Sequence, residues 1–130
     1  MKIHIAAAAA VFALAVSHTA GAQVSQVEVT TAPVITPDTK VYTREQVPPD
    51  KTDFYPVRAA EDEVAGETVL VCHVADDMRP DKCVVASEKP AGYGFGEAAA
   101  LAVLKYGKAN PGTQKAGDWL KLTFKFSLGG

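Results

Sequence analysis

The sequence predicts an α+β fold in two layers, with a three-stranded antiparallel sheet, one main helix on one face and a short N-terminal helix. Three observations carry this prediction: two β-rich runs around a polar turn, an alanine-rich helical stretch, and a strictly alternating C-terminal run. All three lie in residues 54–130, which we interpret as the compact domain. Residues 1–22 have the pattern of a signal peptide, and residues 23–53 that of an extended linker rich in Pro, Thr and Val.

The central hairpin is predicted from two runs, Val69–Val74 and Cys83–Ala86, that flank the turn-forming segment Asp76–Asp81. If the two runs pair so that the numbers of each opposed pair of residues add up to 155, Cys72 lies opposite Cys83. Directly opposed residues in an antiparallel pair have Cβ atoms about 4.5–5.5 Å apart, so a small adjustment would close a disulfide. The sequence therefore predicts this bridge, and two free buried thiols are the alternative.

Two helices flank this hairpin in the predicted order. Val57–Glu63 has an apolar stripe at helical spacing, which indicates a short helix. Glu97–Tyr106 is dominated by Ala and Leu, and the charges of Glu97 and Lys105 at its two ends suit the helix dipole. Because alanines are small, this main helix can lie close to the sheet.

The last run, Trp119–Leu128, alternates between apolar and other residues, which is typical of a half-buried strand. The face predicted to be buried carries Leu120, Leu122, Phe124, Phe126 and Leu128. The opposite face carries Trp119, Lys121, Thr123, Lys125 and Ser127. We expect the second face to meet water.

The N-terminal segment has the features of a cleavable signal. A basic start precedes the apolar run Ile5–Val16, and Ala20-Gly21-Ala22 predicts cleavage before Gln23. An uncleaved anchor in the inner membrane is the alternative, but a spanning helix needs about twenty apolar residues and this run has twelve. The prediction is an exported protein of the periplasm.

The linker prediction for residues 23–53 comes from four prolines, which oppose a helix and a strand inside a sheet. These are Pro33, Pro37, Pro48 and Pro49. Val24–Val29 does alternate, and pairing of this short run with a sheet edge is the alternative.

Composition and spacing give little support to catalysis or to nucleic-acid binding. The formal net charge of −2 becomes −3 without residues 1–22, because these contain one lysine and no acid, so no basic excess attracts nucleic acid. His73 stands alone beside Cys72, and the aspartates of the turn lack the spacing of a calcium loop. Gly92, Gly94 and Gly96 match no phosphate-binding pattern. We expect no enzyme activity, metal, cofactor or small-molecule substrate.

A succession of short motifs resembles the C-terminal domain of the TonB family of energy transducers over about residues 54–128. Its members are Tyr55-Pro56, Ala59, Gly66, Val69–Val74, Asp81–Pro90, Gly92–Leu101, Pro111, Gly117 and Phe124–Leu128. Family members with paired cysteines and a G-F-G-E-A-A segment are especially similar. The chain departs from the family at Tyr106–Asn110, which keeps one aromatic residue, and in its short N-terminal part, where transducers have a membrane helix and a long proline-rich spacer.

The resemblance implies a function in TonB-dependent transport. In the family the first strand of the domain is central, and the last lies at an edge and adds to an extended segment of outer-membrane receptors. This implies a partner-binding edge at Trp119, Lys121, Thr123, Lys125 and Ser127, with Tyr55 and Pro56 near the contact. The alternative is a stand-alone periplasmic protein that keeps the fold for another partner or for self-association as a homodimer, without energy transduction.

Overall fold

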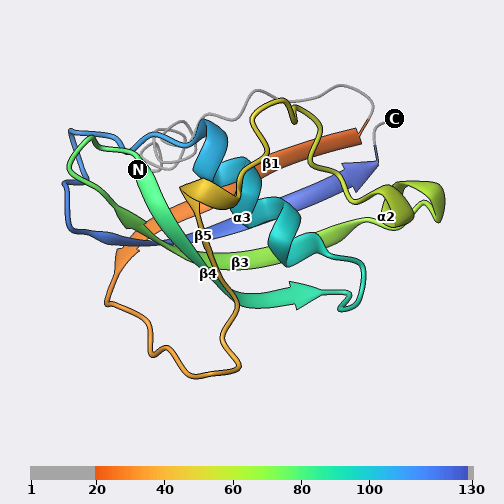
Figure 1. The fold of residues 1–130 in the computed structure, drawn as a ribbon, viewed down its shortest axis with the longest axis horizontal. Coiled ribbons are helices and arrows are strands. Elements are labelled where there is room, and N and C mark those ends of the chain that lie inside the picture. Colours follow the sequence, from red (N-terminus) through yellow and green to blue (C-terminus); the bar gives the residue numbers. More distant parts are fainter. Residues whose placement is uncertain (1–19, 129–130) are drawn as a thin grey trace, which may run out of the picture.

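The computed structural model describes residues 20–128, which form one five-stranded antiparallel sheet with a helix across one face (Figure 1). The strand order is β1-β5-β3-β4-β2. The elements are β1 Ala20–Thr30, β2 Val41–Thr43, the 3-10 turn η1 Arg44–Gln46, α2 Val57–Glu61, β3 Gly66–Val74, β4 Pro80–Lys89, α3 Phe95–Tyr106 and β5 Trp119–Leu128. The α+β class holds, and β3 lies at the centre of the sheet.

The predicted three-stranded sheet is wrong, because the segment expected to be a linker supplies two more strands. β1 pairs with β5 and β2 pairs with β4, at opposite ends of the sheet. The prolines do not prevent this, since Pro33 and Pro37 lie between the two strands and Pro48 and Pro49 follow η1. A proline disrupts a ladder only where its own amide is needed. Residues 31–40 connect β1 to β2, the strands at the two edges of the sheet.

The hairpin of β3 and β4 confirms the predicted disulfide. Cys72 lies opposite Cys83 and Leu70 opposite Val85, as the predicted register requires. The bridge joins the two cysteines, both fully buried, with 4.0 Å between their Cα atoms. A bridge closing a loop of this size contributes about 3 kcal/mol by loop-entropy estimates. Near the turn the ladder is irregular, so Val74 pairs with Pro80 and not with Asp81, as the predicted register would require.

The core lies between α3 and the face of the sheet that it covers. Its largest fully buried side chains are Phe95, Phe124, Phe126, Leu70, Leu104, Leu120, Leu122, Val74 and Val103. α3 begins after Gly94, whose φ of 85° is left-handed and favours glycine. A Cβ on Gly96 would lie 2.8 Å from Val85 Cγ1, so this glycine lets the helix approach β4. Its amide donates to the Glu88 carboxylate.

Candidate strand-pairing site

β5 has one buried face and one accessible face, as its alternation predicts. Leu120, Leu122, Phe124 and Phe126 are buried toward α3. Leu128, which was also expected on the buried face, is instead 39% exposed, because it lies beyond Phe126, where the β3–β5 ladder ends. The expected partner-binding residues lie on the opposite face. Among them Lys121, Lys125 and Ser127 are exposed, whereas Trp119 and Thr123 are half-buried.

β5 is not an edge strand, which corrects the expectation for this site. β3 pairs with one side of it, and β1 pairs with the other side from Thr30 opposite Trp119 to Ala20 opposite Leu128. In Figure 1 the two strands run side by side over their whole length. The outer main-chain groups of β5 are therefore already paired within the chain. A partner strand reaches them only if β1 leaves.

The side chains of β1 hold it weakly to the rest of the protein. Among residues 22–30, the part of β1 whose side chains the structure describes, only Val24 is buried, while Ala22 and Val27 are half-buried against the core and Val29 is 52% exposed. The ladder is interrupted at Ser25, whose Oγ donates to the Thr123 carbonyl at 3.3 Å. Few buried apolar contacts place a segment at the low end of local stability. The main-chain ladder is thus the chief attachment of β1.

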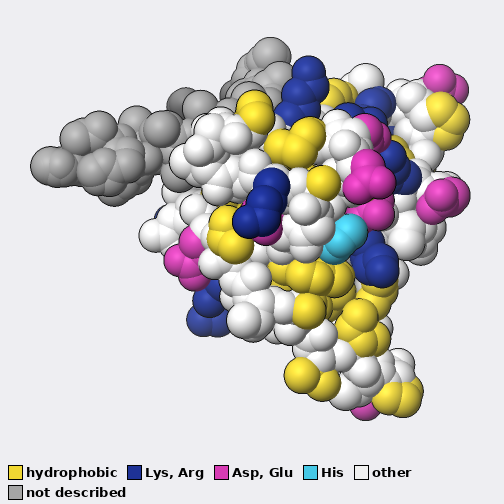
Figure 2. All heavy atoms as spheres, turned by 90° about the vertical axis from the view of Figure 1, so that its left-hand side faces the viewer, with side chains coloured by type: hydrophobic (Ala, Val, Ile, Leu, Met, Phe, Trp, Pro, Cys, Tyr) yellow, Lys and Arg dark blue, Asp and Glu magenta, His cyan; other side chains and the backbone are white. Residues whose placement is uncertain are grey.

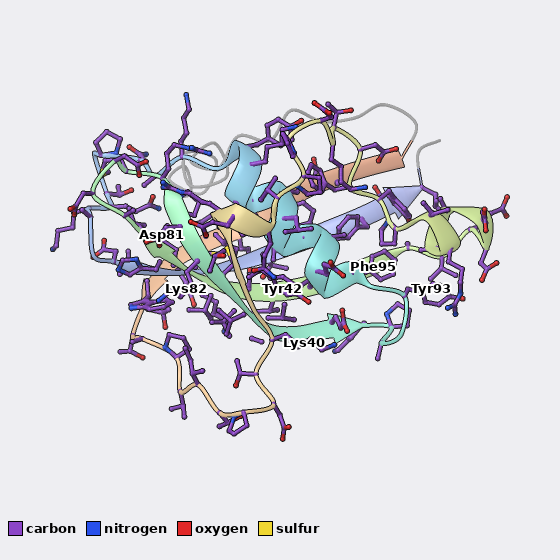
Figure 3. All side chains as sticks on the ribbon, viewed as in Figure 1. Lys40, Tyr42, Asp81, Lys82, Tyr93 and Phe95 are labelled. Atoms are coloured by element: carbon purple, nitrogen blue, oxygen red, sulfur yellow. A yellow bond between two sulfur atoms is a disulfide. The ribbon has the colours of Figure 1, made fainter. Side chains whose placement is uncertain are left out.

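One end of β5 is supported by an aromatic cluster. The Tyr55 ring meets Phe126 edge-on, with 5.4 Å between centroids, and its hydroxyl donates to the Val64 carbonyl at 2.7 Å. Phe95, labelled in Figure 3 at the start of α3, completes the cluster at 5.0 Å from Phe126. Burial raises the pKa of Tyr55. Tyr55 therefore belongs to the core, and only the adjacent Pro56, which is half-buried, is accessible to a partner.

The other end of β5 carries a polar cluster that the sequence did not reveal. His73 Nδ1 lies 2.9 Å from Asp81 Oδ1, and the His73 ring packs on Trp119 at 5.0 Å. Lys82 Nζ lies 5.9 Å from the centre of the Trp119 ring. Figure 3 shows Asp81 and Lys82 together on β4. Among residues 20–128, no three or more His, Cys, Asp and Glu side chains are grouped to hold a metal ion.

A groove of about 420 Å³ lies between the 31–40 segment and β3–β4. Its lining residues are Pro33, Val34, Thr36, Asp38, Thr39, Lys40, Val71, Val84, Val85, Ala86, Ser87 and Glu88. Figure 2 shows hydrophobic side chains gathered on the lower part of this face and on the lower protrusion that this segment forms. Val34 is 85% exposed there.

An unpaired stretch of sheet edge, on the outer side of β4, lies beside this groove. Within the described part of the chain, the last main-chain hydrogen bond on the outer side of β4 runs from the Val85 amide to the Lys40 carbonyl, at 3.0 Å. Beyond it the outer edge of 86–89 has no strand partner. Within the described residues, the outer sides of the two edge strands, β1 and β2, have no strand partner, and neither does the end of β4 that extends past β2.

Fold and site together define an α+β protein with a disulfide-bridged hairpin and a long main-chain pairing surface on β5. No protein family, curated protein or solved structure matches this chain. In the described range, 20–128, no helix has the length and apolar character needed to cross a membrane.

Proposed function

We propose that this chain is a periplasmic protein-binding module of TonB type, which pairs β5 with an extended segment of an outer-membrane receptor in place of β1. One observation carries the proposal: a weakly packed strand of the chain itself occupies the outer side of β5. The family resemblance of the sequence supports the choice of partner. Because β1 already covers β5, binding takes the form of strand replacement and not of simple addition to an open edge.

Export is the second part of the proposal. The signal peptide expected at 1–22 falls mostly outside the described residues, and its last three residues begin β1. The buried Cys72–Cys83 bridge fits an oxidising compartment, where disulfides persist. With cleavage before Gln23, the exported protein begins within β1.

Strand replacement has a small energetic cost for the main chain, because a partner segment restores the hydrogen bonds that β1 gives up. Side chains therefore decide which segment is favoured, as in other cases of strand addition. An apolar side chain opposite Phe124 would take the place of Val24, which is the buried residue of β1. Acidic side chains opposite Lys121 and Lys125 would find complementary charge on the accessible face. The expected partner segment is thus extended, apolar on one face and acidic on the other.

Locking β1 onto β5 tests the proposal. Glu28 and Lys121 are opposed and exposed, so a Glu28→Cys/Lys121→Cys variant can form a bridge across the two strands. Isotope-labelled protein is titrated with extended peptides from outer-membrane receptors before and after mild reduction. We expect peptide binding at the β5 amides only in the reduced form. The native bridge is fully buried and should survive the mild reductant.

The matched control is Glu67→Cys/Lys125→Cys, which joins β5 to β3 on its inner side. Like the test variant, it replaces one glutamate and one lysine, here Glu67 of β3 and Lys125 of β5. It leaves β1 free to separate from β5. The control should bind peptide whether oxidised or reduced. Equal binding by the oxidised Glu28→Cys/Lys121→Cys variant would contradict the proposal and direct attention to the open edges of β1 and β4.

Self-association is the second candidate function, since the outer edge of β1 is free and Val29 is exposed on it. The interruption at Ser25 and the charge of Glu28 are features that discourage pairing between edges. The free edge of β1 therefore gives weaker support to a homodimer than the covered β5 gives to strand replacement. Sedimentation of the exported protein over a range of concentrations separates monomer from dimer.

A further inference from the structure

The C-terminal end of β5 has a distinct place in partner binding, and this inference rests on the proposed function. We infer that the outer edge of Phe126–Leu128, here called the terminal subsite, is where an incoming extended segment first pairs with the protein. The segment then replaces β1 progressively along β5.

The first observation is that the expected cleavage site and one end of the β1–β5 ladder coincide. Ala20, Gly21 and Ala22 lie opposite Leu128, Ser127 and Phe126. The same three residues form the small-residue motif that precedes the expected cleavage. Removal of 1–22 therefore removes every β1 partner of the terminal subsite and leaves the rest of β1 in place.

The second observation is that the terminal subsite has a fixed base and a free end. Phe126 pairs with Gly66 of β3 on its inner side and is 1% exposed against Tyr55 and Phe95. Ser127 and Leu128 pair with β1 alone, because the β3–β5 ladder ends at Phe126. After cleavage these two residues have no strand partner on either side within the described chain. An unpaired strand end of this kind is a template for another strand.

The third observation is the apolar surface next to the terminal subsite. Leu128 is 39% exposed and Val57, the first residue of α2, is 70% exposed. Figure 1 shows α2 near the C-terminal end of β5, and the contact of Tyr55 with Phe126 joins the two regions. An incoming segment with an apolar side chain near its N-terminal end would find contacts here. The first contact therefore favours a segment with an apolar residue near its N-terminal end.

The direction of replacement follows from the ladder. A segment that takes the place of β1 runs antiparallel to β5, so its N-terminal residues pair with the terminal subsite. Its later residues then displace β1, beginning at Gln23 and ending at Thr30 opposite Trp119. Each main-chain bond of β1 is replaced as it is lost, and β1 never has to leave in a single step.

Two peptides copied from β1 test the inference, because their register on β5 is known. One covers residues 20–30 and the other 23–30, and only the first can pair with the terminal subsite. The exported protein is first weighed by mass spectrometry to establish that it begins at Gln23. Association of each peptide, labelled at its C-terminal end, is then followed by fluorescence anisotropy. We expect the longer peptide to associate about tenfold faster. This ratio of rates corresponds to an activation free energy that is lower by about 1.4 kcal/mol.

The control is a variant with Val-Gly-Val inserted between Ala22 and Gln23, so that the exported protein still covers its own terminal subsite. The insertion does not repeat the small-residue motif of the cleavage site, and the mass of the exported variant should show that the three inserted residues are retained. On this variant the two peptides should associate at the same rate. Equal rates on the unmodified exported protein, or a mass showing that 20–22 are retained, would overturn the terminal subsite and leave strand replacement standing. Failure of both peptides to bind would overturn strand replacement itself, and the terminal subsite with it.

Discussion

At the scale of single residues, Thr68 is a buried polar group without a partner. It is fully buried opposite Phe124, and within the described structure its hydroxyl makes no hydrogen bond. Because a buried unpaired hydroxyl is costly, Thr68→Val should stabilise the protein by about 1 kcal/mol in urea unfolding. Thr68→Ser is the control, since it keeps the hydroxyl and loses a methyl, and it should destabilise. A loss of stability in the valine variant larger than that in the serine variant would contradict this account.

Adjacent residues of β5 should respond very differently to truncation. Phe124 is fully buried whereas Lys125 is exposed. Phe124→Ala is expected to lower the free energy of unfolding by about 3–5 kcal/mol, because it removes a large core side chain. Lys125→Ala is expected to change it by less than about 0.5 kcal/mol. Similar losses for the two variants in denaturant unfolding would show that the strand faces are assigned wrongly.

Some of these residue environments could be predicted from the sequence and others could not. The pairing of Cys72 with Cys83 follows from a hairpin whose two runs are visible in the sequence. The contact of His73 with Asp81 depends on the irregular register near the turn, which no local pattern specifies. Sequence spacing alone therefore placed the bridge and missed the polar cluster.

At the scale of elements, β1 shows why two strands were missed. The residues of β1 that face α3 include Val24 and Val27, which are three positions apart because the register shifts at Ser25. A bulge interrupts the period of two that predicts strands, so the short alternation of Val24–Val29 indicated pairing with a sheet edge only as the alternative to a linker. β2 has three residues, too few for any pattern. Both strands depend on a sheet edge built by residues that come later in the chain.

The side chain of Arg44, the first residue of η1 directly after β2, contacts the β3–β4 turn, and this contact is expected to be acid-sensitive. The guanidinium donates to Asp77 Oδ1 at 2.8 Å and to the Pro80 carbonyl at 2.9 Å. The hydrogen bond from Arg44 holds the pKa of Asp77 below its ordinary value of 3.8. The stabilising contribution of Asp77 is therefore complete above that ordinary value and is lost as the pH falls through the lowered pKa.

The test compares Asp77→Asn with the unmodified protein in urea unfolding at several pH values. The unmodified protein should be more stable at neutral pH, and the difference should shrink as the pH falls below 3.8, the ordinary pKa of this carboxyl group. Asp76→Asn is the control, because it leaves the hydrogen bond between Arg44 and Asp77 in place. A stability difference between Asp77→Asn and the unmodified protein that stays constant down to the lowest pH would show that the ion pair does not stabilise the fold.

At the scale of the whole molecule, the sheet is arranged around β3, with β4 fixed by the disulfide on one side and β5 on the other. The two outer strands differ from this centre, since residues 22–30 of β1 include one buried side chain, Val24, and β2 is short. The parts of the fold specified locally, β3–β5 and α3, are those that the sequence predicted. Under the proposed function, the outer strands decide how a partner reaches the sheet.

Native-state hydrogen exchange on the protein without residues 1–22 tests most directly whether β1 is a replaceable cover for β5. Along β5, amides that bond to β1 alternate with amides that bond to β3. We expect the amides of β1 and the β1-facing amides of β5 to exchange by local opening, at least about tenfold faster than the β3-facing amides, a ratio that corresponds to about 1.4 kcal/mol. If all β5 amides instead exchange at one common rate set by global unfolding, β1 does not open on its own and the central claim is contradicted.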